Sequence, residues 1–219
     1  MKESQTTMTL TLTASRNKKN YYKIYINDEF LGCLPQKLIP AEYFLQTSFT
    51  ISESDRGEDA HFIAFTKEHT FNYAQSTLLN YLAKAERTVY DCKIILRKHE
   101  IPDKVIDTVI KDAISKKWLS DKRYAELYTE DAIMMERSPL DIKHKLLQKR
   151  IDTEIINKVI QESFCIDKKK EIIEALIDKL VARYTDLKPT QKFEKIASTL
   201  YRKGFEYGDY EEILNRKVR

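Results

Sequence analysis

Two stretches of this chain that lie fifty residues apart resemble each other, and this repeat constrains the fold more than any other feature. When residues 86–110 are set against residues 136–160, nine of the 25 positions are identical, whereas unrelated stretches would share about one or two. A repeat of this period indicates stacked helical units that bury each other's apolar faces. The sequence therefore favours an elongated binding surface over a catalytic pocket. The identical pairs are Glu86/Glu136, Arg87/Arg137, Asp91/Asp141, Lys93/Lys143, Leu96/Leu146, Ile101/Ile151, Ile106/Ile156, Val109/Val159 and Ile110/Ile160.

The composition is that of a charge-rich, soluble and largely helical protein. Of the 219 residues, 33% are charged and 42% are apolar, and only 4 Gly and 5 Pro are present. The N-terminal residues form no apolar signal core, and no apolar run approaches the roughly 18 residues of a membrane span. We therefore expect a cytoplasmic protein. Cys33, Cys92 and Cys165 are odd in number and far apart, which argues against a disulfide framework or a zinc knuckle.

The N-terminal part of the chain has the pattern of β-strands. Residues 6–52 contain stretches in which apolar and polar side chains alternate, such as residues 8–12 (MTLTL) and 22–26 (YKIYI). Residues 27–29 (Asn-Asp-Glu) follow with turn chemistry, so we expect a hairpin there. These features predict a small β module over residues 1–57 that packs on the helical part of the chain.

The hydrophobic period becomes helical after residues 52–59, a polar run that we take as the domain boundary. From there the sequence predicts three tandem repeats, each of three helices. The expected repeats cover about 58–118, 119–165 and 166–219, and their opening helices cover about 62–85, 121–136 and 167–184. Residues 70–72 are a candidate interruption of the first opening helix, and either Ser120 or Asp121 caps the second.

The middle helix of the first two repeats has a matched start signal. Thr88 precedes Asp91 by three residues, and Ser138 precedes Asp141 in the same way. In such a pair the hydroxyl accepts a hydrogen bond from an unpaired amide, and the acid reaches back to another. Pro139 falls at the first helical position, where its missing N–H costs nothing.

The matched apolar stripes define the expected fold class. Leu96 and Leu146 hold the same place in the first two middle helices, and Leu200 holds it in a fainter third unit at a spacing of 54. We therefore predict a mainly α protein, in which tandem three-helix repeats form a curved elongated solenoid behind the small N-terminal β module.

Motifs for catalysis or cofactor binding are missing from the sequence. It has no phosphate-binding glycine loop, no dinucleotide-binding glycine pattern and no His-Glu-x-x-His zinc motif. His61 and His69 lie eight residues apart without an acidic partner that would complete a metal site. We therefore predict no catalytic residues, no metal and no cofactor.

Basic residues are the better candidates for function. The net charge is +4, and residues 1–60 contribute −1 (7 basic minus 8 acidic), which leaves +5 for the remainder. Short basic runs recur near the end of each middle helix, at residues 97–99, 149–150 and 202–203. Cations at a helix C-terminus also complement the helix dipole, which accounts for one or two of them per unit. Further runs are Lys116-Lys117, Lys122-Arg123, Lys143-His144-Lys145 and Lys168-Lys169-Lys170. Stacking would bring repeated positions onto one basic track.

Several segments resemble the RecX family of bacterial recombination regulators. Residues 118–128 (WLSDKRYAELY) are similar to the family's signature of a leucine, small or acidic residues, an arginine, an aromatic residue and an alanine. Arg137-Ser138 and residues 149–151 also fit, as do residues 71–74 and 79–82 followed by Arg87. The resemblance covers essentially the whole chain, and it differs where Thr88 replaces the usual serine.

The resemblance implies a non-catalytic monomer of tandem three-helix units that lies in the groove of the RecA–DNA filament and mainly inhibits its ATPase and strand exchange. Some members also bind single- or double-stranded DNA. Two other interpretations stay open, namely a stand-alone DNA-binding protein that uses the same basic track and a scaffold for an unrelated partner. The predicted contact residues are Arg97, Lys98, Arg123, Tyr124, Arg137, Lys143, Lys149 and Arg150.

Overall fold

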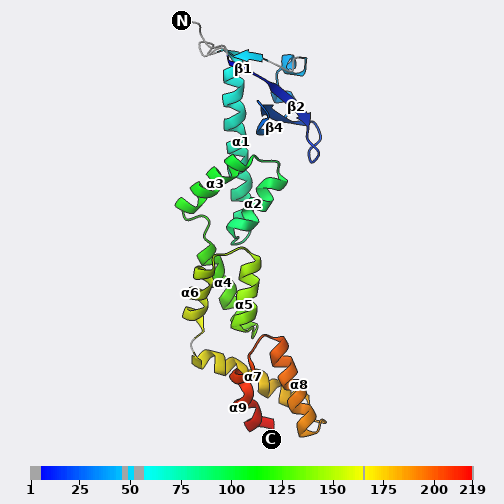
Figure 1. Cartoon of the computed structure of the whole chain (residues 1–219), viewed down its shortest axis with the longest axis vertical. Helices are drawn as coiled ribbons and strands as arrows, with labels where there is room; N and C mark the ends of the chain where they lie inside the picture. Colours follow the sequence, from blue (N-terminus) through cyan, green and yellow to red (C-terminus); the bar gives the residue numbers. More distant parts are fainter. Residues whose placement is uncertain (1–5, 46–48, 52–56, 165, 219) are drawn as a thin grey trace. The chain divides into compact units, whose positions relative to one another are not determined.

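The protein is described by a computed structural model that covers residues 6–45, 49–51, 57–164 and 166–218. It divides into two compact units, Met1–Leu119 and Ser120–Arg219. Most of the described chain is α-helical, and a small antiparallel sheet precedes the helices (Figure 1). This confirms the expected fold class of a mainly α chain with an N-terminal β module. Residues 52–56 of the predicted boundary, and Cys165, lie outside the described residues.

The sheet of the first unit is a three-stranded meander in the order β2-β3-β4. Its strands are β2 (Leu10–Ala14), β3 (Tyr21–Ile26) and β4 (Glu29–Pro35). A two-residue turn joins β3 to β4, with positive φ at Asn27 (47°) and Asp28 (64°). This is the turn geometry whose twist matches that of an antiparallel pair, so the predicted hairpin is present. A separate pair joins β1 (Thr6–Met8) to β5 (Phe49–Ile51).

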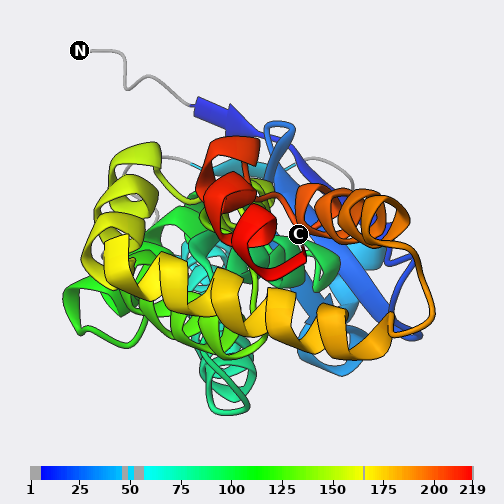
Figure 2. The same ribbon diagram turned by 90° about the horizontal axis from the view of Figure 1, so that it is seen from below.

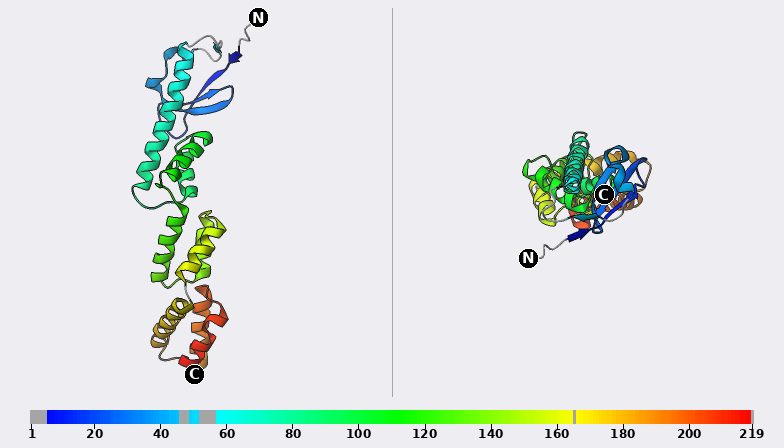
Figure 3. Two further views of the ribbon diagram at one scale, coloured as in Figure 1. Left: turned by 90° about the vertical axis from the view of Figure 1, so that its left-hand side faces the viewer. Right: turned by 90° about the horizontal axis from the view of Figure 1, so that it is seen from above.

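Helix α1 (Glu58–Leu82) packs along β4, as the left view of Figure 3 shows. The approach is close at Gly32, where an added Cβ would lie 1.9 Å from Oγ1 of Thr70, so glycine is required there. The core between sheet and helix includes Ile24, Leu34 and Phe62. The helix begins before the predicted residue 62, and it continues without a break through residues 70–72.

Two shorter helices complete the first unit. Helices α2 (Val89–Lys98) and α3 (Asp103–Ser115) pack on each other and on α1. Their apolar faces join the C-terminal half of α1 in one core. Its buried residues are Ala74, Leu78, Cys92, Leu96, Ile101, Ile106, Val109, Ile110, Ala113 and Leu119.

The second unit contains two successive helical triplets. The first consists of α4 (Asp121–Met134), α5 (Pro139–Gln148) and α6 (Thr153–Ser163). The second consists of α7 (Ile166–Arg183), α8 (Pro189–Arg202) and α9 (Tyr207–Val218). Figure 2 shows α7, α8 and α9 side by side, and each of the three packs against the other two.

The helix starts agree with the sequence signals. Oγ1 of Thr88 accepts a hydrogen bond from the amide of Asp91, and Oγ of Ser138 accepts one from the amide of Asp141, both at 3.1 Å. Ser120, rather than Asp121, caps α4 by the same contact. Pro139 is the first residue of α5, as predicted. Thr88 and Ser138 thus fix where α2 and α5 begin, whereas the N-cap residue of α8 (Pro189–Arg202), Lys188, makes no side-chain cap hydrogen bond.

Matched positions of the repeat are buried in all three triplets. Leu96, Leu146 and Leu200 are each completely buried in the middle helix. Ile151 and its counterparts Ile101 and Phe205 are buried in the turn that follows. The same apolar side chains therefore hold each triplet together, whereas the assignment of the triplets as separate tandem domains stays a prediction.

Candidate partner-binding surface

The three middle helices α2, α5 and α8 end in the same backbone motif. One residue after the helix cap has a positive φ in each case, namely 56° at Glu100, 59° at Arg150 and 86° at Gly204. The next amide then donates to a carbonyl five positions earlier, as Ile151 does to Leu146 at 3.3 Å. This is a Schellman motif, which usually has glycine at the left-handed position. Glu100 and Arg150 hold a conformation that costs a residue with a Cβ about 1–2 kcal/mol.

The predicted basic residues do not fall at equivalent positions of this motif. Arg97 and Lys98 are the last two residues of α2, whereas Lys149 caps α5 and Arg150 is the left-handed residue that follows. In the first unit the place of Arg150 is taken by Glu100, which is an acid. The basic runs that look alike in the sequence therefore present different charges at the turn.

Arg97 and Lys98 are exposed at the end of α2. Nε of Arg97 lies 2.9 Å from Oδ1 of Asp103, in an ion pair whose side chains are 56% and 71% exposed. Such an exposed pair contributes little to stability. Among the described residues, Lys98 has no carboxylate within ion-pair distance, and its carbonyl accepts a hydrogen bond from Nδ2 of Asn17 at 3.4 Å.

Arg123 and Tyr124 lie in the first turn of α4. The amide of Arg123 donates to Oγ of Ser120 at 3.2 Å, so its backbone belongs to the helix cap. The ring of Tyr124 stacks on that of Tyr128, with centroids 6.3 Å apart, and both rings pack against the core of α4–α6. Burial, followed by the charge of Asp141, raises the pKa of Tyr128. Tyr124 therefore has a packing role in addition to any contact role.

Arg137 directly precedes Ser138, the cap of α5, and Lys143 lies in the middle of that helix. Nη1 of Arg137 is 3.4 Å from Oδ2 of Asp141, one helical turn away. Lys143 lines a groove of about 340 Å³ between α5, α6 and the segment that joins α8 to α9. Lys169 and Asp209 meet on the other side of this groove at 2.6 Å. The groove therefore holds charges of both signs.

Lys149 and Arg150 lie at the far end of α5 from Arg137. A helix of ten residues is about 15 Å long, so α5 separates Arg137 from Lys149 and Arg150. Arg150 is exposed, and its guanidinium has no carboxylate within ion-pair distance in the described part of the chain. The turn after α5 thus holds Arg150 in a fixed backbone geometry, and its exposed guanidinium has no counter-ion among the described residues.

A polar network at the equivalent turn of the first unit was not predicted. Glu100 is buried, accepts a hydrogen bond from Oγ of Ser15, and has Oε1 2.9 Å from Nζ of Lys23. Burial raises the pKa of Glu100, but the contacts with Ser15 and Lys23 outweigh it, and the pKa lies below its usual value. Nearby, Nζ of Lys18 donates to the hydroxyl of Tyr73 at 2.8 Å. These contacts join residues far apart in the sequence, so no local pattern indicates them.

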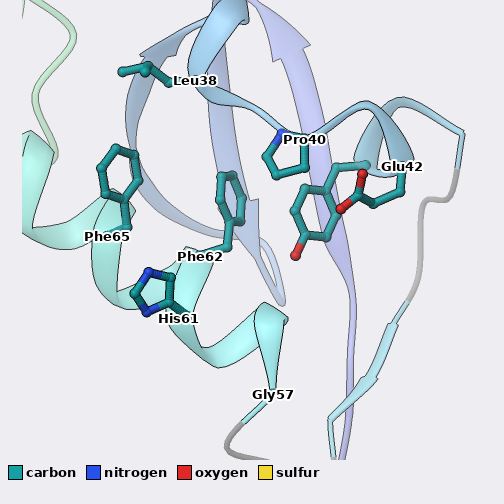
Figure 4. A pocket seen from close by; sticks show the side chains of 8 residues that line it. Leu38, Pro40, Glu42, Gly57, His61, Phe62 and Phe65 are labelled. Carbon is teal, nitrogen blue, oxygen red and sulfur yellow. The ribbon is translucent and has the colours of Figure 1, made fainter.

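A second side of the first unit carries an apolar cavity of about 580 Å³ (Figure 4). It lies between α1 and the two short 3-10 helices at Gln36–Leu38 and Ala41–Phe44. Phe62 extends from α1 toward Pro40, Phe65 extends toward Leu38, and His61 also lines the cavity. No convergent set of polar groups among its lining residues indicates a specific ligand.

The described residues have neither a metal-binding cluster nor a membrane-crossing helix. They contain no group of three or more His, Cys, Asp or Glu side chains placed to hold a metal ion. No helix in the described part of the chain combines the length and the apolar character needed to cross a membrane.

Comparison with known proteins agrees with the resemblance. The family model for the second three-helix domain of RecX matches residues 120–160. A regulatory protein RecX of Streptococcus uberis is 31% identical over 142 residues, which is 63% of this chain and 52%, or about half, of that relative. One of Streptococcus pyogenes is 26% identical over 206 residues, covering 93% of this chain and 76% of the relative.

The fold has a counterpart among solved structures. A crystal structure of regulatory protein RecX superimposes with a TM-score of 0.64 at 22% identity, covering 96% of this chain and 100% of the other. The domain match coincides with α4–α6, and the sequence matches extend over most of both units. These matches support a relationship between the chain and the RecX family of regulatory proteins.

Proposed function

We propose that this protein is a non-catalytic regulator that binds the RecA–DNA filament and modulates, mainly by inhibition, its ATPase and strand exchange in recombination and DNA repair. In this proposal it acts in the cytoplasm as a monomer and needs no cofactor. Its effect comes from occupying a surface of the filament rather than from chemistry of its own.

One observation carries the proposal. The segment that matches the RecX domain, residues 120–160, contains six of the eight predicted contact residues. Its relatives are named regulatory proteins. The six residues are Arg123, Tyr124, Arg137, Lys143, Lys149 and Arg150.

The charges in this segment suit a repetitive partner. Exposed cations add little affinity one at a time, because solvent screens them. A filament presents the same surface many times, so several weak contacts made together add through effective concentration. Complementary charge also speeds the encounter with an acidic surface. The repeated triplets therefore support binding to an assembly better than binding to a small ligand.

Sedimentation tests the proposal directly. RecA is assembled on single-stranded DNA with a non-hydrolysable nucleotide, and the full-length protein is added. We expect it to pellet with the filament and to lower the ATPase rate of RecA when ATP is supplied. A protein that stays in the supernatant with the filament, yet binds bare DNA, would contradict the proposal.

The alternative is a stand-alone DNA-binding protein. It is favoured by the consecutive basic residues Lys143, His144 and Lys145 on α5, of which His144 and Lys145 are exposed. Lysine side chains at such a surface neutralise phosphates and release counterions. Under this alternative, affinity for bare DNA equals affinity for the filament and falls steeply with salt.

A further inference from the structure

The turn after α2 already holds an occupant from within the chain. Ser15 and Lys23 both contact the carboxylate of Glu100, and Nδ2 of Asn17 donates to the carbonyl of Lys98. The occupant is thus the loop between β2 and β3 together with the start of β3. Lys23 supplies the cation that pairs with Glu100, and Asn17 supplies the donor for the carbonyl of Lys98 at the end of α2.

The turn after α5 has the same backbone but the opposite charge. Arg150 and Glu100 have φ values of 59° and 56°, and in both turns the next amide donates to the carbonyl of the matched leucine at 3.3 Å. Arg150 is exposed, and no carboxylate of the described residues lies within ion-pair distance of it. The turn after α5 therefore has the same backbone geometry as the turn after α2, but the described residues supply no counter-ion for Arg150.

We propose that the turn after α5, centred on Arg150, is a docking position for an acidic polypeptide loop of the partner. This inference rests on the proposed function and narrows it: the turn meets a protein carboxylate on the filament rather than DNA. The guanidinium takes the carboxylate in a two-pronged hydrogen bond, which mirrors the ion pair between Lys23 and Glu100 with the charges exchanged.

A polypeptide fits this turn better than a phosphate backbone does. The amides of Lys149, Arg150 and Ile151 pair the carbonyls of residues 145–147. The carbonyl of Gln148, the counterpart of the Lys98 carbonyl, still needs a donor. A loop offers a carboxylate for Arg150 together with an N–H donor for that carbonyl, as Asn17 does for Lys98 in the first unit. A phosphodiester backbone carries acceptors without donors, so it pairs with the cation but offers no donor to the carbonyl of Gln148.

The key variant is Arg150→Gly, because glycine keeps the left-handed turn while the charge is removed. Its matched control is Arg183→Gln, which removes a positive charge from an exposed residue at the end of α7. The affinity of each full-length protein is measured for RecA filaments on single-stranded DNA and, separately, for bare single- and double-stranded DNA. We expect Arg150→Gly to weaken filament binding about tenfold and leave bare-DNA binding unchanged, whereas Arg183→Gln binds the filament as the natural sequence does.

A chemical probe identifies the partner group. In Arg150→Lys, the new amine is treated with a carbodiimide in the presence of the filament. This reagent joins an amine to a carboxylate with loss of water, and it leaves internal phosphodiesters unchanged. We expect an amide cross-link from position 150 to an aspartate or glutamate of the filament protein, located by mass spectrometry.

The outcomes separate this inference from the proposed function. If the natural sequence binds the filament and Arg150→Gly binds it equally well, the docking position is wrong and the proposed function stands. If Arg150→Gly weakens filament and bare-DNA binding by the same factor, the turn meets phosphate and the inference is overturned. If the natural sequence does not bind the filament at all, both proposals fail.

Discussion

Nζ of Lys23 lies 2.9 Å from Oε1 of Glu100, and this ion pair joins β3 to the turn that ends α2. The side chain of Glu100 is only 6% exposed, and its carboxylate also accepts a hydrogen bond from Ser15. Because Glu100 occupies a strained left-handed position, the contacts made by its side chain offset a backbone cost. The sheet is therefore coupled to the helices by polar contacts as well as by its apolar core.

Replacing Glu100 with Gln should destabilise the first unit. The variant keeps the side-chain shape but removes the charge that Lys23 faces, and breaking a mostly buried pair leaves the other charge poorly compensated. We expect the free energy of unfolding to fall by about 2–3 kcal/mol, measured by urea denaturation. A double-mutant cycle with Lys23→Met isolates the pair. A coupling energy near zero between the two positions would show that the ion pair does not stabilise the junction.

The carboxylate of Glu100 should make the free energy of unfolding depend on pH. The pKa of Glu100 is lowered in the folded protein, since the contacts with Ser15 and Lys23 outweigh the opposing effect of burial. A carboxyl group with a lowered pKa stabilises the folded state above its unfolded pKa, and that stabilisation is lost as the pH falls through the folded pKa. We expect the difference in unfolding free energy between the natural sequence and Glu100→Gln to shrink below pH 5. Denaturation curves from pH 7 to pH 3 measure it, and a constant difference would contradict the assignment.

Gly204 should tolerate no side chain. Its φ is 86°, and an added Cβ would lie 2.6 Å from Oγ of Ser138, the cap of α5. We expect Gly204→Ala to lower the free energy of unfolding by about 2–3 kcal/mol, from backbone strain and from displacement of the cap. Gly208→Ala is the matched control, because a Cβ there meets nothing within 4 Å and the residue lies in α9. Thermal unfolding of the two variants compares them, and equal loss in both would rule out a specific role for the turn.

Local patterns were sufficient to predict the helices, their caps and the hairpin. Alternation, three-residue cap spacing and the apolar stripe each depend on residues within one or two turns of one another. The junction at Glu100 could not be predicted, because Ser15 and Lys23 come from the distant sheet. The basic runs were aligned by composition, which placed Arg97 and Lys98 beside the wrong residues of the second repeat. The repeat spacing of fifty residues pairs Glu100 with Arg150, and their matching backbone geometry confirms that pairing.

Arg150 provides a test in which stability and binding change in opposite directions. Its φ of 59° is strained for any residue with a Cβ, and its side chain has no ion pair among the described residues to offset that strain. We therefore expect Arg150→Gly to raise the free energy of unfolding by about 0.5–1 kcal/mol, measured by urea denaturation. Arg150→Ala removes the same charge but keeps the Cβ, so it should leave stability nearly unchanged. If alanine stabilised the protein as much as glycine, the gain would come from relief of charge repulsion instead of the backbone. A stabilising Arg150→Gly that binds its partner weakly would indicate that the arginine is retained at this turn for binding, at a cost in stability.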